Sequence, residues 1–430
     1  MKKITEKFFK IKLYFLRFST ENSDEKIFDI WNGLSLVIRI LCGLIVGALL
    51  GIFVPQATGV AILGDAFVGA LKAIAPLLVF FLLIASVSNE RQSQKRIIRK
   101  VLVLYLLCTF SAALVGVLAS KLFPITLTLT VPAAHMAAPE GIAQVLRTLF
   151  SNMVANPIHS LANGNYIGIL IWGILIGVAL RNANDHTKKV LNDISSGLSK
   201  VVTWIIKLAP FGIMGLVFSS VSESGLEIFS EYGRLLLVLV GSMLFVYFVV
   251  NPIFVFWCIR QNPYPLIIKC IKKSAVTAFF TRSSAANIPV NMKACEEFGL
   301  DKDTYSVTIP LGATINMDGA AVTITVMSLA AVHTLGIQID ILSALVLGIL
   351  ATGAACGASG VAGGSLLLIP MACSLFGIPN EVAMQVVGIG FIIGVVQDSV
   401  ETALNSSTDL LLSASAEFRQ WRRIGKEIKF

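Results

Sequence analysis

The apolar residues of this chain follow two different patterns along its length. Six long apolar runs come first, and each is close to the roughly 20 residues that a helix needs to cross a bilayer. After Arg260 the apolar pieces shorten to about 10 to 14 residues, interrupted by Ser, Gly, Asn and Pro, as in re-entrant segments. We therefore predict six ordinary membrane spans within 33–258, at 34–54, 63–88, 97–123, 160–181, 197–221 and 233–258.

The charges of the connecting segments orient these spans, because Lys and Arg collect on the cytoplasmic side of a membrane. Basic residues crowd the second and fourth connections, whereas the third, 124–159, has few charges and the fifth carries three glutamates. We expect the second and fourth connections on the cytoplasmic side and the third and fifth on the external side, with both termini cytoplasmic. Residues 1–32 are predicted to be an amphipathic cytoplasmic segment on the membrane, since no signal-peptide cleavage pattern precedes the first long run. Residues 417–430 are predicted to form a basic cytoplasmic tail.

The segment 259–416 is predicted to contain an inverted repeat. A hairpin over 265–300 enters from the inside and a span over 304–335 crosses outward; a hairpin over 340–378 then enters from the outside and a span over 382–416 crosses inward. Each half is a hairpin followed by a broken helix, and such repeats place substrate and ions near the middle of the membrane. The predicted fold is an all-α polytopic membrane protein with eight transmembrane helices and two re-entrant helical hairpins.

Composition supports an integral membrane protein. Of the 430 residues, 56% are hydrophobic and only 14% are charged, which is more apolar surface than a soluble core of this size can hide. The net charge of +9 comes largely from basic residues beside apolar segments, which favours contact with anionic membrane lipid over nucleic-acid binding. The seven cysteines lack metal-ligand or disulfide spacing and are expected to be core thiols. No nucleophile and base lie at a spacing that indicates an enzyme, and no cofactor motif is present.

The run Asn316-Met317-Asp318-Gly319 is the most informative polar break in the chain, because it sets a carboxylate inside an otherwise apolar span. Charged groups at membrane depth usually face a protein interior or an ion path. Backbone opened by Gly and Asn is tolerated there only where it lines a cavity. We expect this cavity to hold a cation.

Two further breaks fall at the tips of the predicted hairpins. The small hydroxyl residues of Arg282-Ser283-Ser284, ahead of Pro289, expose backbone amides that can bind a carboxylate; a simple polar turn is the alternative. The stretch from Gly357 to Gly364 is unsuited to a helix interior, where each Gly costs up to about 1 kcal/mol relative to Ala. It suits a mobile gate, and close helix packing is the alternative.

A fourth polar stretch forms one stripe along a helix. Glu401 lies beside this stripe and is a candidate partner for Arg282. Two inward carboxylates suit an ammonium and a metal cation, and an internal ion pair is the alternative for each. Alkali cations prefer oxygen ligands, and the absence of His disfavours a transition metal. The stripe is spaced by four, three and four residues and consists of Asp398, Thr402, Asn405 and Asp409.

These motifs resemble the dicarboxylate/amino acid:cation symporter family, which has the glutamate-transporter fold. The resemblance covers residues 34–416 and rests on the run from Gly312 to Gly319, the serine-containing first hairpin and the Gly-rich second hairpin. Within the family, the stretches 283–289 and 397–407 are most similar to the bacterial serine/threonine:sodium symporters. The resemblance implies homotrimers of independent protomers that move substrate by an elevator motion. Spans 1, 2, 4 and 5 would form the scaffold, and spans 3 and 6 would join the transport core.

The resemblance also implies roles for individual residues. Asp398 would bind the ammonium group of the substrate. The carboxylate group of the substrate would be bound by Asn405 with Ser283, Ser284 and Ala285, and Thr314, Gly360 and Thr402 would border the pocket. The co-transported ion, sodium, would bind at three sites. The first would use Gly312, Asn316, Asn405 and Asp409, and the second Asp318, Tyr105, Cys108, Thr109 and Asn316, with Cys108 replacing a family threonine. The third would use Thr314 with carbonyls near Ala355, Cys356 and Ala358.

Glu401 stands where dicarboxylate carriers of this family place an arginine that pairs with the second carboxylate of the substrate. A negative side chain there should repel aspartate and glutamate and accept a hydrogen bond from a hydroxyl substrate. We therefore expect sodium-coupled import of L-serine and L-threonine across a bacterial cytoplasmic (inner) membrane. The alternatives are a ligand-gated channel or receptor lined by the same acids, and a carrier of dicarboxylates.

Overall fold

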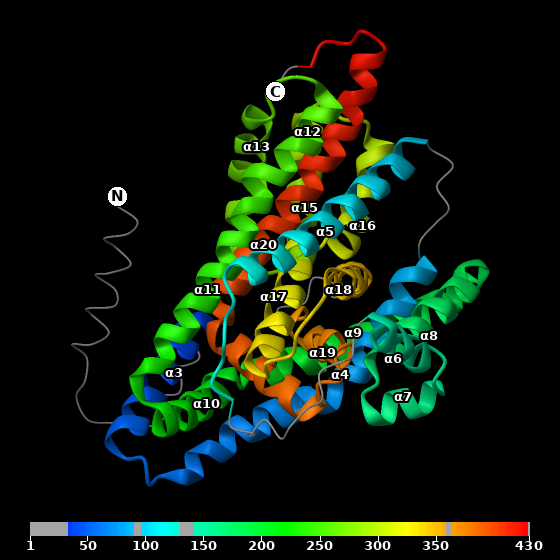
Figure 1. The fold of residues 1–430 in the computed structure, drawn as a ribbon. Coiled ribbons are helices and arrows are strands. Elements are labelled where there is room, and N and C mark those ends of the chain that lie inside the picture. The colour runs from blue at the N-terminus through cyan, green and yellow to red at the C-terminus, as the bar shows by residue number, and fades with distance from the viewer. Residues whose placement is uncertain (1–32, 90–95, 130–141, 358–362, 429–430) are drawn as a thin grey trace, which may run out of the picture.

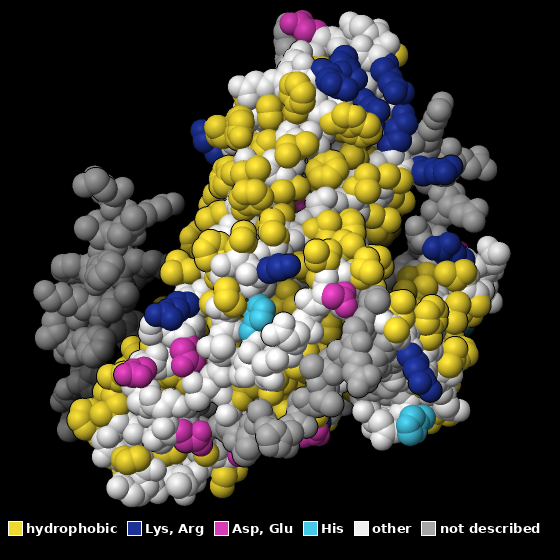
Figure 2. All heavy atoms as spheres, viewed as in Figure 1, with side chains coloured by type: hydrophobic (Ala, Val, Ile, Leu, Met, Phe, Trp, Pro, Cys, Tyr) yellow, Lys and Arg dark blue, Asp and Glu magenta, His cyan; other side chains and the backbone are white. Residues whose placement is uncertain are grey.

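The computed structural model describes residues 33–89, 96–129, 142–357 and 363–428, and all regular secondary structure in these ranges is helical (Figure 1). Six helical segments of this part are long and apolar enough to cross a membrane. Apolar side chains cover much of the face seen in Figure 2, and a group of Lys and Arg side chains lies at the end where α20 (Asn380–Arg423) terminates. The described chain is that of a polytopic helical membrane protein. The predicted amphipathic segment 1–32 lies outside the described residues.

The first three predicted spans coincide with long helices. The first of them, α3 (Leu36–Phe53), packs along α10 (Ala209–Ser224). Its glycines recur every fourth residue at Gly43, Gly47 and Gly51, and a Cβ atom added at each would meet the backbone of α10. Small residues at this spacing let two helix backbones approach closely. The three helices are α3 (Leu36–Phe53), α4 (Ala61–Asn89) and α5 (Arg96–Leu122).

The fourth predicted span, 160–181, is divided in the structure. It follows α6 (Ile142–Met153) and consists of the end of α7 (Pro157–Asn163) and the whole of α8 (Tyr166–Ala179). Gly164, in the left-handed region at φ 65°, ends α7, a position that glycine takes without steric cost. The apolar helix of this segment is therefore shorter than expected.

The fifth predicted span, 197–221, was wrong as a single helix. Its residues belong to two helices, α9 (Asp185–Lys207) and α10, which meet at Leu208. Pro210 stands in the first turn of α10, where its missing N–H is tolerated because first-turn amides have no partner within the helix. The sixth span, 233–258, agrees with the structure as an unbroken run from Ile228 to Ile259.

The two segments predicted as hairpins each form helices joined by a reversal. The first hairpin reverses at Arg282, a non-glycine residue at φ 49°. In the second, residues 358–362 between the two helical parts lie outside the described chain. The first consists of α13 (Tyr264–Cys270), a π-helical turn (Ile271–Ala275), α14 (Val276–Thr281) and α15 (Ser284–Glu297). The second consists of α18 (Ile341–Ala355), a 3-10 turn (Leu366–Leu368) and α19 (Ile369–Ser374).

Only one of the two predicted broken helices is broken. α16 (Lys302–Ile315) and α17 (Asp318–Thr334) are interrupted as expected. The second break was wrong, because α20 is continuous over 44 residues. Several of its hydroxyl groups bond within the helix: Ser407 donates to the carbonyl of Ala403 and Thr408 to that of Leu404. Such bonds to the preceding turn let a helix carry a polar stripe without opening its backbone.

α20 lies at the centre of the described molecule (Figure 1). It packs against α5, α11 (Ile228–Phe245), α12 (Asn251–Ile259), α14, α15, α16, α17 and α19. Its acidic residues Asp398, Glu401 and Asp409 are all buried. The polar stripe predicted from the sequence therefore faces the protein interior.

Gly47→Leu is expected to weaken the packing of α3 on α10, because the side chain would have to enter the Met214 backbone. Overpacking of this kind costs about 1 to 3 kcal/mol, so the unfolding temperature of the purified protein should fall. Gly69→Leu on α4 is the control, since nothing lies within 4 Å of a Cβ atom there. Equal unfolding temperatures for the two variants would contradict a tight α3–α10 contact.

Candidate functional site

The break between α16 and α17 brings two helix ends together inside the protein. Asn316 (φ −89°, ψ 84°) and Met317 (φ −120°, ψ 56°) leave helical geometry, so α16 ends and α17 begins within two residues. Terminal carbonyls of α16 and terminal amides of α17 lose their intrahelical partners. Asn405 on α20 satisfies one of these amides, since its Oδ1 accepts from the Gly319 N–H at 2.7 Å. The break can thus offer carbonyl oxygens to a cation.

Asp409 and Asn316 form the first polar cluster at the break. Asn316 Nδ2 donates to Asp409 Oδ1 at 2.9 Å and to Thr408 Oγ1 at 2.8 Å. Gly312 lies against this pair, because a Cβ atom there would stand 2.6 Å from Asp409 Oδ1 and 2.9 Å from the Tyr105 hydroxyl. Asn316 Oδ1 and Asp409 Oδ2 are buried without a hydrogen-bond partner. The cluster leaves two acceptor oxygens free.

Asp318 forms a second cluster with α5. Thr109 Oγ1 donates to its Oδ1 at 3.1 Å, and its Oδ2 is buried without a partner. Cys108, also fully buried, lies on the same helix. Tyr105, expected beside Asp318, is directed to the other cluster, where its hydroxyl contacts Ser413 Oγ at 2.7 Å.

These two clusters fit a hard cation. A buried acceptor without a partner costs about 1 to 3 kcal/mol, and the unpartnered oxygens of Asn316, Asp318 and Asp409 all lie at one break. Carboxylate, amide and carbonyl oxygens are the ligands that hard cations prefer. The described residues contain no group of three or more His, Cys, Asp or Glu side chains that could hold a metal ion.

The third predicted ion site is described in part. The Thr314 hydroxyl donates to the Leu311 carbonyl of its own helix at 2.9 Å. Cys356 Sγ donates to the Ile315 carbonyl at 3.4 Å, so the end of α18 touches the break. Ala355 is buried beside it, whereas Ala358 and Gly360 lie outside the described residues.

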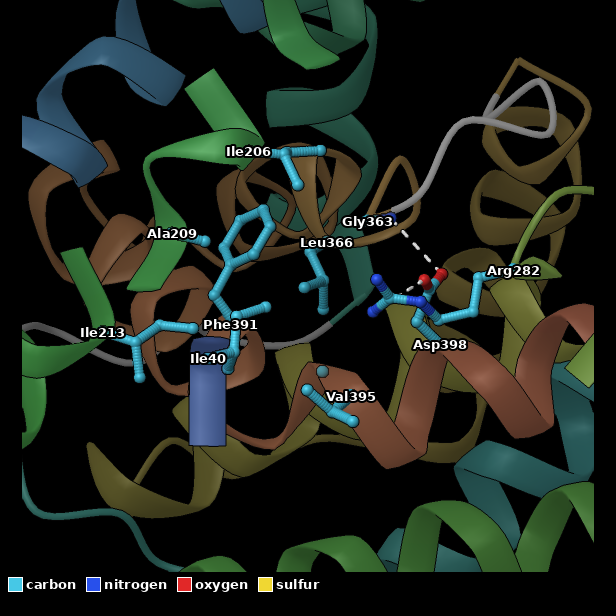
Figure 3. Close-up of a pocket in the computed structure, with 11 residues that line it drawn as sticks. Ile40, Ile206, Ala209, Ile213, Arg282, Gly363, Leu366, Phe391, Val395 and Asp398 are labelled. Atoms are coloured by element: carbon cyan, nitrogen blue, oxygen red, sulfur yellow. Dashed lines mark hydrogen bonds and ion pairs between the residues drawn. The ribbon is translucent and has the colours of Figure 1, made fainter. Parts of the chain in front are cut away.

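Asp398 is the point at which both hairpins meet α20. Its Oδ1 accepts from the Gly363 N–H of the second hairpin at 3.3 Å, and its Oδ2 lies 3.9 Å from Arg282 Nη1 of the first (Figure 3). The expected pairing of Arg282 with Glu401 was therefore wrong, because Glu401 is directed toward Thr323 on α17. A cavity beside this pair is lined on its apolar side by Ile40, Ile206, Ala209, Ile213, Leu366 and Phe391.

The tip of the first hairpin has the form of a helix cap. Ser283 Oγ accepts from the Ala286 N–H at 3.2 Å, and Ser284 and Ala285 occupy the first turn of α15. Amides in a first helical turn can bind an anion. Asn405, the other residue predicted for the substrate carboxylate, uses its Oδ1 on Gly319.

Glu401 is buried next to Asp398 on α20, and three donors converge on its Oε2 atom. Thr323 Oγ1 donates at 2.7 Å and Ser365 Oγ at 2.9 Å, and Gln397 Nε2 donates as well. Every hydrogen bond to this side chain within the described chain ends on Oε2. An oxygen that only accepts acts as a carboxylate oxygen does, and Oε1 remains available to a ligand.

A model of the sodium:dicarboxylate symporter family matches residues 36–417, which is most of the chain. The chain belongs to the sodium:dicarboxylate symporter family. The family resemblance inferred from the motifs is thereby confirmed. The protein is a sodium-coupled transporter of the membrane, so sodium is cargo, and the unpartnered oxygens of the break suit it. Membership in a transporter family agrees with the expectation that the protein is not an enzyme.

The site of the symporter also contains residues that were not predicted from the sequence. They are hydrogen-bond partners of the predicted site residues rather than those residues themselves. A hydroxyl in a membrane helix most often bonds within its own helix, so Thr323, five residues after Asp318, gives no separate signal. The residues missed in this way are Thr323, Ser365, Gln397, Thr408 and Ser413.

Gly312→Ala is expected to weaken sodium binding by the symporter, because the new methyl group would displace the Asp409 carboxylate or the Tyr105 hydroxyl. Disturbing the neighbours of a metal ligand typically costs about 10- to 100-fold in metal affinity. The sodium concentration for half-maximal transport should rise accordingly. Gly241→Ala on α11, where an added Cβ meets nothing within 4 Å, should match the native protein. An unchanged sodium dependence for Gly312→Ala would remove Asp409 from the ion site.

Proposed function

We propose that this symporter imports L-serine and L-threonine together with sodium across a bacterial cytoplasmic (inner) membrane. The observation that carries the proposal is the Glu401 carboxylate, which is anchored by three donors on Oε2, while no described residue bonds to Oε1. Asp398 lies three residues earlier on the same helix and takes the substrate ammonium. A hydroxyl group on the side chain then reaches Glu401 Oε1 as a donor.

The same placement excludes acidic substrates. Aspartate held by its ammonium at Asp398 would set its second carboxylate against Glu401, at an interior site where water screens like charges poorly. Repulsion of this kind gives specificity more effectively than an added attraction. The dicarboxylate alternative would require a cation in place of Glu401.

We assign the substrate carboxylate to the amides of Ser284 and Ala285 behind the Ser283 cap, with Asn405 as its other partner. Thr314 and Thr402 border the pocket, and Gly360 belongs to the part of the second hairpin that is not described. Arg282 contacts Asp398 at 3.9 Å, so binding of the ammonium exchanges one cation for another at this carboxylate. That exchange releases the tip of the first hairpin.

Sodium occupies three positions in this proposal, all at the break. Asp409 with Gly312, Asn316 and Asn405 holds one ion, and Asp318 with its α5 neighbours Cys108 and Thr109 and with Asn316 holds another; Thr314 with Ala355, Cys356 and Ala358 holds the third. The hydroxyl of Tyr105, first expected at Asp318, belongs to the Asp409 cluster. Asn405 belongs to an ion site and to the substrate site. Shared residues of this kind couple two binding equilibria, since each ligand then favours the same arrangement.

Transport follows an elevator alternating-access mechanism in a homotrimer. The transport core would be the two hairpins, α16, α17 and α20 with α5, α11 and α12, which pack on one another, and the scaffold would be α3, α4 and α8 to α10, which pack together. Contact of both hairpins with Asp398 favours a closed carrier site over the open pore of a channel or receptor. Both termini are placed in the cytoplasm.

Uptake into proteoliposomes tests the function directly. Labelled serine should accumulate under an inward sodium gradient, and unlabelled threonine should compete while aspartate should not. Omitting the gradient or replacing sodium by choline is the control. Accumulation of aspartate instead of serine would establish the dicarboxylate alternative, and sodium currents without accumulation would establish a channel.

Glu401→Arg is expected to reverse the selectivity, because a guanidinium at this position attracts a second carboxylate and offers no acceptor to a hydroxyl. Serine uptake should be lost and aspartate should become a competitor. Glu401→Gln serves as the isosteric comparison, keeping an acceptor without the charge. If acidic amino acids stayed excluded and serine uptake were unchanged in both variants, Glu401 would have no role in specificity.

A further inference from the structure

Asn251, the first residue of α12, is a fully buried amide without a partner. Its side chain is 0% exposed, and neither Nδ2 nor Oδ1 makes a hydrogen bond. Among the buried side chains that the structure describes, it alone has both amide atoms unpartnered. Such a group has lost its hydration without gaining a hydrogen bond, which destabilises the folded protein. This indicates that something other than the described side chains completes the site.

The surroundings of Asn251 are those of the Asp318 cluster. Its side chain lies beside the Asp318 carboxyl group, as do the hydroxyls of Thr109 and Thr408. Asp318 Oδ2 is itself buried and has no partner at regular hydrogen-bond geometry, so the amide and the carboxylate lie next to each other in a contact that is looser than a regular hydrogen bond. Four elements meet here, since these residues come from α5, α12, α17 and α20.

The local backbone also sets Asn251 apart. It directly follows the π-helical turn Val246–Val250, and such turns are frequent at functional sites. Between Leu235 and Ile259 it is the only residue with an amide or charged side chain. An amide in a lipid-spanning helix is costly and usually functional when it faces the protein interior.

We propose that Asn251 is a ligand of the sodium ion at Asp318, to which it supplies its Oδ1 atom. This inference rests on the sodium site assigned to Asp318 in the proposed function. The oxygens of Thr109, Asn251, Asp318 and Thr408 then form one shell, as hard cations prefer. A neutral amide completes this shell without adding a second negative charge, so one carboxylate balances one sodium ion. The ion would join α12 to the broken helix.

The test measures sodium binding without substrate. The unfolding temperature of the purified symporter is followed as sodium replaces choline, because a ligand that binds only the folded state raises that temperature. Asn251→Leu, of similar size, should raise the sodium concentration for half-maximal stabilisation by about 10- to 100-fold. Asn251→Asp retains an oxygen ligand and should restore sodium binding. Ser242→Ala in the same span, which loses only a bond to the Val238 carbonyl, should behave as the native protein.

A double variant separates this inference from the sodium assignment beneath it. If Asn251 and Asp318 bind the same ion, the double variant Asn251→Leu/Asp318→Asn should respond to sodium as Asp318→Asn does, since residues of one site are not additive. A native sodium response in Asn251→Leu, with its unfolding temperature shifted equally in choline, would overturn the proposal and leave a buried water as the occupant. A native response in Asp318→Asn would overturn the Asp318 sodium site as well, while serine selectivity at Glu401 would stand untouched.

Discussion

Of the five buried carboxylates in the described chain, four lie at the candidate site inside a protein whose outer surface meets lipid, and their burial shapes the C-terminal half. Ionised groups in a poorly polar interior are tolerated only when they are paired or hydrogen-bonded. Asp398 pairs with Arg282 and accepts a hydrogen bond from the Gly363 amide, and Glu401 accepts hydrogen bonds from three donors. Asp409 accepts a hydrogen bond from Asn316, and Asp318 accepts one from Thr109. Each partner comes from a different element than its acid, except Gln397, so the acids hold the hairpins and the broken helix against α20.

Three of the acids are hydrogen-bonded through only one of their two carboxylate oxygens. For Asp318, Glu401 and Asp409, the described residues donate to one oxygen and leave the other without a hydrogen bond. A partly satisfied polar network is less stable than a complete one, so we propose that the cargo supplies the missing partners. The binding energy of sodium and substrate would then be linked to the closed arrangement of the break and the hairpins.

Irregular backbone supports this network at two places. The break at Asn316 and Met317 and the reversal at Arg282 supply carbonyls, amides and a guanidinium that a regular helix cannot present. α20 carries three of the acids and stays continuous, and several of its hydroxyl groups bond to its own preceding turns. A rigid central helix surrounded by opened segments fixes the positions of the charges while the surrounding segments remain able to rearrange.

The membrane class, the hairpin segments, the break at Asp318 and the inward stripe of α20 could all be predicted from the sequence, because hydropathy, glycine content and helical spacing are local properties of the chain. The tertiary structure was needed to show that α20 is unbroken, that the fifth span divides at Leu208 and that Arg282 pairs with Asp398 rather than Glu401. It alone joined Thr323 and Ser365 to Glu401, and Asn251 to Asp318. The reason is physical: the partner of a polar side chain depends on which helix packs against it, and spacing along one helix contains no information about its neighbour.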